Sequence, residues 1–401
     1  IHKLLSCMHI RFRVGRNYSG AIDNRPFLEA NMPNTPRVFL YGASGYTGKL
    51  VAESLALRNI PFVFAGRNPQ RLEEALKIVE ERIGRAVEAR IESAGNTVEE
   101  LLPLLQGVDV MINVAGPFMQ ISWPMVEACL QAGVHYLDTT GEQDWVLAIR
   151  EKYGQAFAAK GLLLNPANSY MWAAGAIAAE VVLETEGVDS LDIVYQIDHG
   201  LPSEASTKSF LRMVCNDQFY LELNELKPWP HDLIAQVALP HRGQVQRALP
   251  WGGACEPVWY LDDPRVRNCK VLTAIGEHIV DGVAQVIAAF NAQARDLPQE
   301  QKEAWTNAAG DQMDTGEPPK DDLDVQRSVI VCNGQGRRVT NQFVMNMSAP
   351  YTWTGEVCAE AAERLLNGQL KRVGFQSAAR AFGHRELLEA FHPGGFCNLP
   401  A

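Results

Sequence analysis

The sequence predicts an α/β fold with a doubly wound parallel sheet, joined to an inserted α+β domain that contains an antiparallel sheet. Strand-like and helix-like patterns alternate between residues 37 and 164, which is typical of βαβ units. After residue 190 the chain instead shows strands separated by a hairpin signal, which favours antiparallel pairing. With 401 residues, of which 47% are hydrophobic, the chain can build more than one core.

The first strand and helix enclose a glycine-rich turn. The apolar run Val38–Tyr41 predicts a buried strand, and Lys49–Leu57 predicts a helix. Between them, Gly42 permits a tight turn, Gly45 lets the backbone approach a pyrophosphate, and Gly48 lets the helix pack closely on the strand. This order of elements predicts a dinucleotide-binding unit of the Rossmann type. The alternative is a glycine-rich turn in another kind of α/β unit.

The start of the predicted helix supplies the phosphate contacts. Its free N–H groups and positive dipole end favour an anion. The hydroxyls of Ser44 and Thr47 are further donors, and we expect Tyr46 between them to contact the cofactor as well.

The end of the second strand indicates which dinucleotide binds. Phe62–Ala65 predicts this strand, and it is followed by Gly66 and Arg67. An acidic residue here would bind the ribose 2′-hydroxyl of NAD, whereas the planar guanidinium of Arg67 suits the 2′-phosphate of NADP. We therefore predict NADP(H) as the cofactor. The alternative is that Arg67 is a solvated charge or stacks on adenine without selecting the cofactor.

The remaining elements of the first half follow from the same periodicities. Three loops, 114–118, 139–142 and 166–170, lie at the predicted carboxyl edge of the sheet, where ligands bind in such folds. We expect strands at Ala86–Ile91, Val108–Asn113, His135–Asp138 and Leu162–Asn165, and helices at Pro69–Ile83, Val98–Leu105, Trp123–Ala132 and Gln143–Lys160.

A series of ordered motifs over residues 37–170 resembles the saccharopine dehydrogenase-like oxidoreductases, a group that includes the trans-acting enoyl reductases. The resemblance implies a Rossmann domain that binds NADP(H), with a smaller α+β domain inserted before the C-terminal helices. Relatives often follow the sixth strand with a Gly-Phe-Asp-Ser-type segment, whereas this chain has Ala167-Asn-Ser-Tyr170. The motifs are Gly42-Ala-Ser-Gly-Tyr-Thr-Gly48, Ala65-Gly-Arg67, Asn113-x-x-Gly-Pro-Phe118, Val126-Glu-Ala-Cys129, Ala132-Gly-Val-His-Tyr-x-Asp138 and Gly141-Glu142.

The resemblance also implies which residues lie along the nicotinamide. They come from the loops after the fourth and fifth strands, and we add Ala115 because it belongs to the first of these loops. The expected residues are Ala115, Gly116, Pro117, Phe118, Thr139 and Gly141.

The second half predicts a different architecture. Leu191–Ile197 alternates like a strand with one buried face, and a helix follows from Ser203, which either caps that helix or contacts substrate. The aromatic stretch 216–275 either packs a small sheet or lines an apolar pocket. Near the end, Asn333-Gly-Gln-Gly336 predicts a hairpin turn. We expect an unstructured arm at 1–32, a Rossmann domain at 33–169, an inserted substrate domain at 170–350 and returning helices at 351–401.

Reduction requires a proton as well as a hydride. The Tyr-x-x-x-Lys pair of short-chain dehydrogenases does not follow the glycine turn. By position at the mouth of the last parallel strand we prefer Tyr170 as the donor, with Glu142 and His199 as alternates. Asn168 and Ser169 are the expected polar positioning residues.

Composition excludes several functional classes. A net charge of −11 argues against nucleic acid as a partner, because a phosphate-binding surface needs clustered cations. The eight cysteines form no Cys-x-x-Cys pair, and no His/Cys grouping has the spacing of metal ligands, so we expect no metal and a reducing, cytoplasmic location. The apolar run Met171–Leu183 is broken by Glu180 and is too short to cross a membrane.

Three functions fit these observations. The first is an NADP-dependent reductase of a small, largely apolar substrate, with enoyl C=C reduction ahead. The second is saccharopine-type C=N chemistry on an amino acid, for which Arg212, Arg242 and Arg247 are the candidate cations. The third is a non-catalytic protein that senses NADP. The sequence does not settle the oligomeric state, but exposed hairpin and helix surfaces are compatible with a homodimer.

Overall fold

A computed structural model describes residues 35–240, 245–312 and 316–400. The predicted arm at residues 1–32 lies outside the described residues. Residues 36–401 form a compact unit by themselves.

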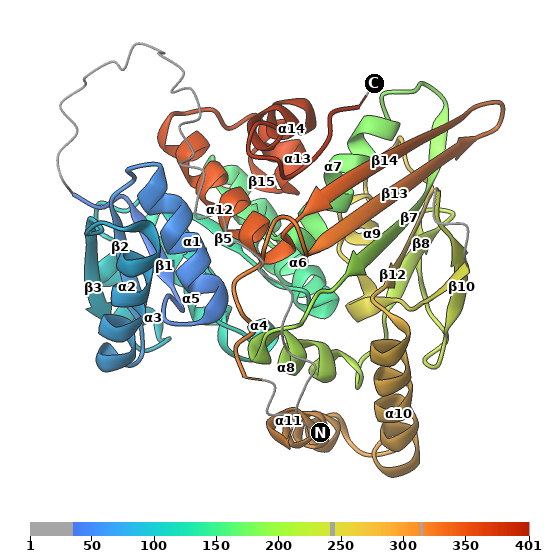
Figure 1. The fold of residues 1–401 in the computed structure, drawn as a ribbon, viewed down its shortest axis with the longest axis horizontal. Coiled ribbons are helices and arrows are strands. Elements are labelled where there is room, and N and C mark those ends of the chain that lie inside the picture. The colour runs from blue at the N-terminus through green and yellow to red at the C-terminus, as the bar shows by residue number, and fades with distance from the viewer. Residues whose placement is uncertain (1–34, 241–244, 313–315, 401) are drawn as a thin grey trace, which may run out of the picture. The chain divides into compact units, whose positions relative to one another are not determined.

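The first sheet of the described chain has seven parallel strands in the order β15-β6-β5-β4-β1-β2-β3. The order reverses between β1 and β4, which gives the crevice at the carboxyl ends that dinucleotides occupy in doubly wound sheets. Figure 1 shows this sheet with α1, α2 and α12 beside it. The strands are β1 (Val38–Tyr41), β2 (Phe62–Gly66), β3 (Ala89–Ser93), β4 (Val110–Asn113), β5 (His135–Asp138), β6 (Leu163–Asn165) and β15 (Gly374–Phe375).

The predicted helices of this half match the structure within a few residues, because local signals fix their ends, whereas the short helix Phe118–Ile121 was not predicted. In α2, Asn68 caps the first turn by accepting from the Arg71 amide, and Gly84 ends the helix in the left-handed conformation. The third strand begins three residues later than predicted, since residues 85–88 first carry the chain back to the sheet. The helices are α1 (Tyr46–Leu57), α2 (Pro69–Ile83), α3 (Val98–Leu101), α4 (Phe118–Ile121), α5 (Trp123–Ala132) and α6 (Gln143–Ala159).

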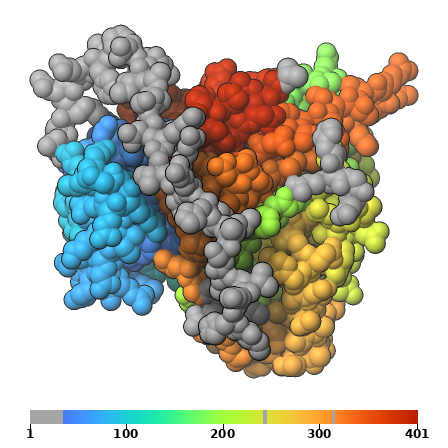
Figure 2. Space-filling model, viewed as in Figure 1, coloured from blue at the N-terminus to red at the C-terminus, as the bar shows by residue number. Residues whose placement is uncertain are grey.

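The C-terminal segment packs on the first sheet. Helix α12 (Pro350–Leu366) lies along α1, and a Cβ at Gly355 would stand 2.7 Å from the Leu50 carbonyl oxygen. Strand β15 then pairs with β6 at the edge of the sheet. In the space-filling view the red C-terminal helices fill the space between the blue first-half elements and the orange strands (Figure 2). The first core is thus built from both ends of the described chain.

The second sheet has the order β14-β13-β7-β12-β8-β9 over the described residues. Most of its neighbours are antiparallel, as predicted, but β7 and β12 run parallel. A parallel pair requires a crossover, and the chain supplies it between Asp198 and Asn268. The strands are β7 (Val188–Asp198), β8 (Phe219–Glu222), β9 (Glu225–Pro228), β12 (Asn268–Ala274), β13 (Arg327–Gly336) and β14 (Thr340–Ser348).

Smaller elements connect these strands and complete the second half. A two-stranded antiparallel pair, β10 (Ala235–Ala238) with β11 (Val245–Ala248), stands beside the larger sheet among the described residues. The helices are α7 (Gly175–Val182), α8 (Glu204–Met213), α9 (Glu256–Trp259), α10 (Glu277–Gln293), α11 (Gln299–Gln312), α13 (Ala378–Phe382) and α14 (His384–Phe391).

The predicted hairpin turn is wrong in position. Asn333 to Gly336 belong to β13, and the chain reverses at residues 337–339. The glycines have a packing role instead: a Cβ at Gly334 would stand 2.2 Å from the Val182 side chain, and one at Gly336 would stand 1.8 Å from the Gly187 carbonyl oxygen. A glycine pair inside a strand can therefore mark close approach of a neighbour as well as a turn.

Candidate NADP-binding and substrate site

The glycine turn has the geometry of a dinucleotide cradle. Gly42 has φ +82°, and a Cβ there would stand 2.9 Å from the Ala115 amide nitrogen. A Cβ at Gly48 would stand 2.5 Å from the Ala43 carbonyl oxygen, so only glycine lets α1 lie this close to β1. Gly45 differs, because its φ of −75° suits any residue and its nearest neighbour would be 3.4 Å away. The turn therefore keeps space next to Gly45, where the pyrophosphate is expected.

The first turn of α1 is prepared for an anion. Among the described residues no side chain caps this helix, and its first turn carries no acidic group. The Thr47 side chain lines a pocket that extends from this turn to residues of the second half of the chain. The Tyr46 hydroxyl faces elsewhere and donates to the Pro319 carbonyl at 2.9 Å. These features fit NADP(H), whereas a contact of the Tyr46 side chain with the cofactor stays a prediction.

Arg67 follows β2 and is exposed, at the edge of the sheet where the adenosine ribose lies in such folds. Its main-chain carbonyl accepts from the Ser93 hydroxyl at 3.3 Å, which ties the turn to the end of β3. The guanidinium is thus presented to solvent from an anchored turn. Its contact with the 2′-phosphate stays a prediction.

The loops after β4 and β5 form the expected nicotinamide side. Gly116, Phe118, Thr139 and Gly141 line the pocket. The Ala115 amide donates to the Asn113 side chain at 3.0 Å, which holds the first loop against the end of β4. The peptide bond before Pro117 is cis.

Asp138 holds the second loop in place. Its fully buried carboxylate accepts from the amides of Thr140 and Ala167 and from the Trp145 indole, at 2.8–3.1 Å. Burial raises the pKa of Asp138 to about 6, and these donors oppose the rise. One carboxylate thus fixes the loops that follow β5 and β6.

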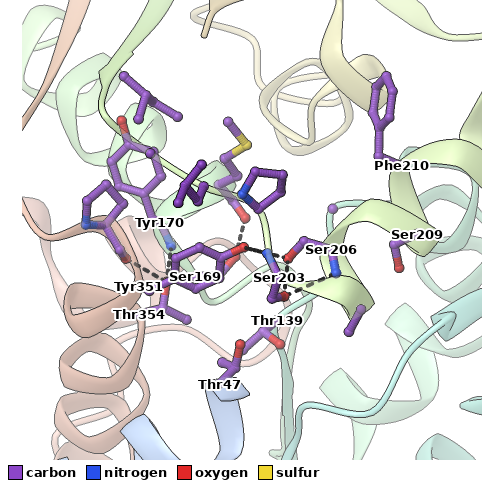
Figure 3. A pocket seen from close by; sticks show the side chains of 18 of the residues that line it. Thr47, Thr139, Ser169, Tyr170, Ser203, Ser206, Ser209, Phe210, Tyr351 and Thr354 are labelled. Atoms are coloured by element: carbon purple, nitrogen blue, oxygen red, sulfur yellow. Dashed lines mark hydrogen bonds between the residues drawn. The ribbon is translucent and has the colours of Figure 1, made fainter. Parts of the chain in front are cut away.

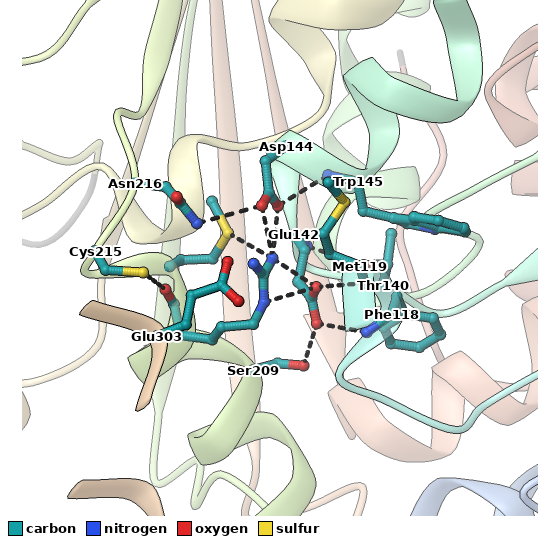
Figure 4. Close-up of polar contacts among 12 residues, drawn as sticks. Phe118, Met119, Thr140, Glu142, Asp144, Trp145, Ser209, Cys215, Asn216 and Glu303 are labelled. Atoms are coloured by element: carbon teal, nitrogen blue, oxygen red, sulfur yellow. Dashed lines mark hydrogen bonds and ion pairs between the residues drawn. The ribbon is translucent and has the colours of Figure 1, made fainter. Parts of the chain in front are cut away.

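Glu142 sits in a buried polar network (Figure 4). Its carboxylate accepts from the amides of Phe118 and Met119 at 2.9 and 3.0 Å and from the Ser209 hydroxyl at 2.7 Å. Arg212 adds two further hydrogen bonds, at 2.7 and 3.1 Å, and also pairs with Asp144. Glu142 and Arg212 are both fully buried. Because its carboxylate accepts five hydrogen bonds, Glu142 holds the loop after β4 and α8 in position. This geometry does not support the predicted role of Glu142 as a proton donor.

The other two proposed proton donors occupy different environments. Tyr170 lines the pocket, and burial raises the pKa of its phenol. Its hydroxyl lies near Ser328 but makes no hydrogen bond with a described residue, and it points away from Thr47 and Thr139 (Figure 3). His199 is exposed, with φ +57°, in the turn after β7, and it is not among the pocket-lining residues. Of the two, only Tyr170 lines the pocket, and its hydroxyl is directed away from the Thr139 side.

The two expected polar positioning residues hold the loop after β6. The buried Asn168 donates its side-chain amide to the Val357 carbonyl at 3.4 Å, and the Ser169 hydroxyl bonds the Met171 carbonyl. Asn168 therefore ties this loop to α12, and Ser169 acts on the main chain next to Tyr170.

The pocket extends from the nicotinamide loops into the second half (Figure 3). Phe210 and Trp251 stack with ring centroids 3.8 Å apart, and both line it. Asp321 is the one charged residue in its described lining. Sequence reasoning missed Ser206, Ser209, Asp321 and Tyr351, because they come from segments far apart in the chain and carry no local motif. The apolar lining residues of this part include Met171, Ile197, Leu201, Pro202, Phe210, Trp251, Ile275, Ile279 and Pro350.

Comparisons with known proteins agree with this geometry. The family model "Saccharopine dehydrogenase NADP binding domain" matches residues 38–159. The fold is similar to apo saccharopine dehydrogenase (L-Glu forming) from Saccharomyces cerevisiae, with a TM-score of 0.60 at 11% identity, covering 90% of this chain and 98% of that chain. The chain thus has the fold of a saccharopine dehydrogenase and a nucleotide-binding half that matches an NADP-binding domain, which confirms the predicted fold class and cofactor. The chain belongs to the family described as "Family of unknown function (DUF5938)", whose model matches residues 173–401.

Individual relatives match mainly the nucleotide-binding half. The saccharopine dehydrogenase-like oxidoreductase of Rattus norvegicus is 27% identical over 157 residues, 36% of this chain and 34% of that protein. The trans-acting enoyl reductase of Mycobacterium ulcerans is 35% identical over 112 residues, 26% of this chain and 25% of that protein. A lipid droplet localized protein of Caenorhabditis elegans is 28% identical over 131 residues, 31% of each chain. The chain thus spans about a third or less of the length of these relatives.

Proposed function

We propose that the protein is an NADPH-dependent reductase that acts on the C=C bond of a small, largely apolar enoyl substrate. The observation that carries this proposal is the pocket: nicotinamide-side loops form one wall, and apolar side chains with a few hydroxyls form the other. When bound, NADPH supplies the hydride. The chain's own residues orient the substrate, exclude water and provide a proton, for which Tyr170 remains our candidate.

The charges around the pocket argue against an amino-acid substrate. A dicarboxylate needs convergent cations, yet the described lining contains no Lys or Arg. Arg212 is fully buried and committed to Glu142 and Asp144, while Arg247 pairs with Glu277 and Asp281 at the surface. Arg242 lies outside the described residues. These positions make saccharopine-type C=N chemistry the weaker alternative.

A pure NADP sensor needs no cavity beyond the cofactor. Here the pocket continues past Thr139 and Gly141 to Phe210 and Trp251, which favours an enzyme with its own substrate. A cytoplasmic location and a homodimer belong to the same proposal. The seven described cysteines are buried and free, as expected in a reducing compartment. Among the described helices, none combines the length and hydropathy of a membrane span.

A substrate panel tests the proposal. Purified protein is mixed with NADPH and matched series of enones and cyclic imines, and absorbance of the reduced cofactor is followed. We expect consumption with enones that carry an alkyl chain and little with imines or amino-acid adducts. Consumption of NADPH with imines alone would favour C=N chemistry instead, and consumption with neither series would favour a non-catalytic NADP sensor.

Tyr170→Phe tests the donor. If Tyr170 protonates the product, turnover of the best enone should fall by about 10²–10⁴-fold, the usual contribution of a general acid. A loss of less than about threefold would remove Tyr170 from the mechanism. The affinity for NADPH, measured by quenching of protein fluorescence, should be unchanged.

A further inference from the structure

Three hydroxyls meet in the middle of the pocket. Ser203 and Ser206 come from the start of α8 and Tyr351 from the first turn of α12, and all three line the cavity. The Tyr351 hydroxyl donates to Ser206 Oγ at 2.9 Å, and the Ser203 hydroxyl donates to the same oxygen at 3.1 Å. Figure 3 shows Ser203 of this cluster next to Thr139, so the cluster faces the nicotinamide side of the pocket from the opposite wall.

A count of protons shows that this cluster is incomplete. The three hydroxyls carry three protons, but only two hydrogen bonds join them. Main-chain amides add no acceptor, because the Ser203 amide donates to Tyr351 Oη at 2.8 Å and the Ser206 amide donates to Ser203 Oγ at 3.3 Å. One hydroxyl proton therefore has no acceptor among the described residues. In the arrangement in which Ser206 Oγ accepts from both neighbours, this free proton is the one on Ser206.

Three other serine and threonine hydroxyls that line the cavity are already committed, whereas those of Thr47 and Thr139, which also line it, make no hydrogen bond with a described residue. Ser209 donates to Glu142 at 2.7 Å, Thr354 donates to the Pro350 carbonyl at 3.0 Å, and Ser169 bonds the Met171 carbonyl. The free donor of the Ser206 cluster is thus distinct from the hydroxyls that hold the pocket wall together. A polar donor exposed in a largely apolar cavity calls for an acceptor on the ligand.

We infer that Ser206 binds the carbonyl oxygen of the substrate, with Tyr351 and Ser203 as positioning residues that donate to it. Two hydrogen bonds into Ser206 Oγ make its own proton a better donor. The ligand class is a neutral α,β-unsaturated ketone or thioester whose alkyl part lies toward Phe210 and Trp251. This inference rests on the proposed enoyl reduction and specifies how that substrate is oriented.

The chemistry balances with this assignment. The β-carbon accepts the hydride, the electrons of the C=C bond move to the carbonyl oxygen, and Ser206 stabilises the enolate oxygen through its hydrogen bond. The α-carbon then takes a proton from Tyr170, the proposed donor, and the carbonyl re-forms. The hydride would come from bound NADPH, with NADP⁺ as its oxidised product. A donor aimed at the oxygen where charge develops is the arrangement that lowers such barriers most effectively.

Ser206→Ala tests the inference through binding and turnover. With NADP⁺ bound no hydride is available, so calorimetry with octan-2-one reports carbonyl recognition alone. We expect the ketone to bind about tenfold more weakly to Ser206→Ala, in keeping with the loss of one hydrogen bond. With NADPH and oct-3-en-2-one, kcat should fall by about 10²–10³-fold. Ser206→Thr should restore both values, and Tyr351→Phe should lie between the wild type and Ser206→Ala.

Tyr220→Phe, a change outside the pocket lining, is the control and should match the wild type in ketone binding. Equal ketone affinity in the wild type and Ser206→Ala, or no ketone binding to either, would overturn the inference. If the wild type reduces no enone while ketone binding depends on Ser206, the carbonyl site stands and the proposed function fails. If the wild type reduces oct-3-en-2-one and Ser206→Ala does so equally well, the inference alone fails.

Discussion

The two walls of the pocket recognise their ligands by different means. On the Rossmann wall the contacts expected for the cofactor come from the main chain, at Gly42, Gly45 and the start of α1. On the opposite wall they come from side chains, such as the Ser206 hydroxyl and the stacked Phe210 and Trp251. A main-chain site depends on where a side chain is absent, whereas a side-chain site depends on which side chains converge. The first should therefore be sensitive to added bulk and the second to lost groups.

The largest expected effect is at the buried ion pair between Glu142, in the loop after β5, and Arg212 of α8. Arg212→Met would leave the Glu142 carboxylate buried without its cation, and the loss of one partner of a buried pair typically costs about 3–5 kcal/mol of stability. Urea unfolding of the two proteins measures the loss. Arg247→Met is the control, because Arg247 pairs with Glu277 and Asp281 at the surface, where ion pairs contribute little to stability. Equal losses of stability in the two variants would contradict the structural role of the buried Glu142–Arg212 pair.

A pair of glycine variants separates folding from binding on the Rossmann wall. Gly48→Ala places a Cβ 2.5 Å from the Ala43 carbonyl oxygen, so we expect a loss of about 1–3 kcal/mol in the free energy of unfolding. Gly45→Ala has room in the fold but fills the space kept for the pyrophosphate, so it should preserve stability and weaken NADPH binding at least about tenfold. A Gly45→Ala protein with normal NADPH affinity would show that the pyrophosphate lies elsewhere.

Arg67→Ala examines the part of this wall that uses a side chain. Hydrogen bonds to charged groups contribute about 1.5–3 kcal/mol, so the affinity for NADPH should fall by about 10–100-fold while that for NADH is unchanged. Isothermal titration with both cofactors measures the change. Lys77→Ala removes a charge from the exposed side of α2 and should have no effect. Equal wild-type affinity for NADH and NADPH would refute the role of Arg67.

The two walls also differ in whether a buried carboxyl group is paired with a cation. Glu142 has a cation, whereas Glu256, beneath the second wall, has one hydrogen bond from Tyr195 at 2.7 Å and an unpaired second oxygen. Burial raises the pKa of Glu256 from its ordinary value of 4.5 to about 8. The unfolded chain ionises near the ordinary value while the folded chain keeps the proton, so this contribution to stability is present at low pH and is lost as pH rises toward 8.

Glu256→Gln should remove this pH dependence with little effect at acidic pH. Thermal unfolding between pH 5 and pH 9 should show the variant gaining stability relative to the wild type as pH increases. Parallel curves for the two proteins across this range would show that Glu256 is ionised in the folded state.

Local sequence signals were sufficient to predict the elements of the Rossmann wall. The strand before Gly42, the helix after it and the capped helix α2 each follow from neighbouring residues, and the structure has them at nearly the predicted positions. The second wall depends on distant segments, since Ser206 and Tyr351 are 145 residues apart and meet only in the folded structure. The glycines 334 and 336 show the same limit, since the close neighbours that require them belong to other parts of the chain.

The central claim is that the two walls hold a nicotinamide against the C=C bond of an apolar enoyl substrate. The most direct test uses NADPH carrying deuterium at C4 of the nicotinamide and oct-3-en-2-one as substrate, with the product analysed by NMR. The account predicts saturated octan-2-one with deuterium at the β-carbon. Deuterium at the carbonyl carbon of an alcohol product, or no transfer to the enone with transfer to an imine instead, would contradict it.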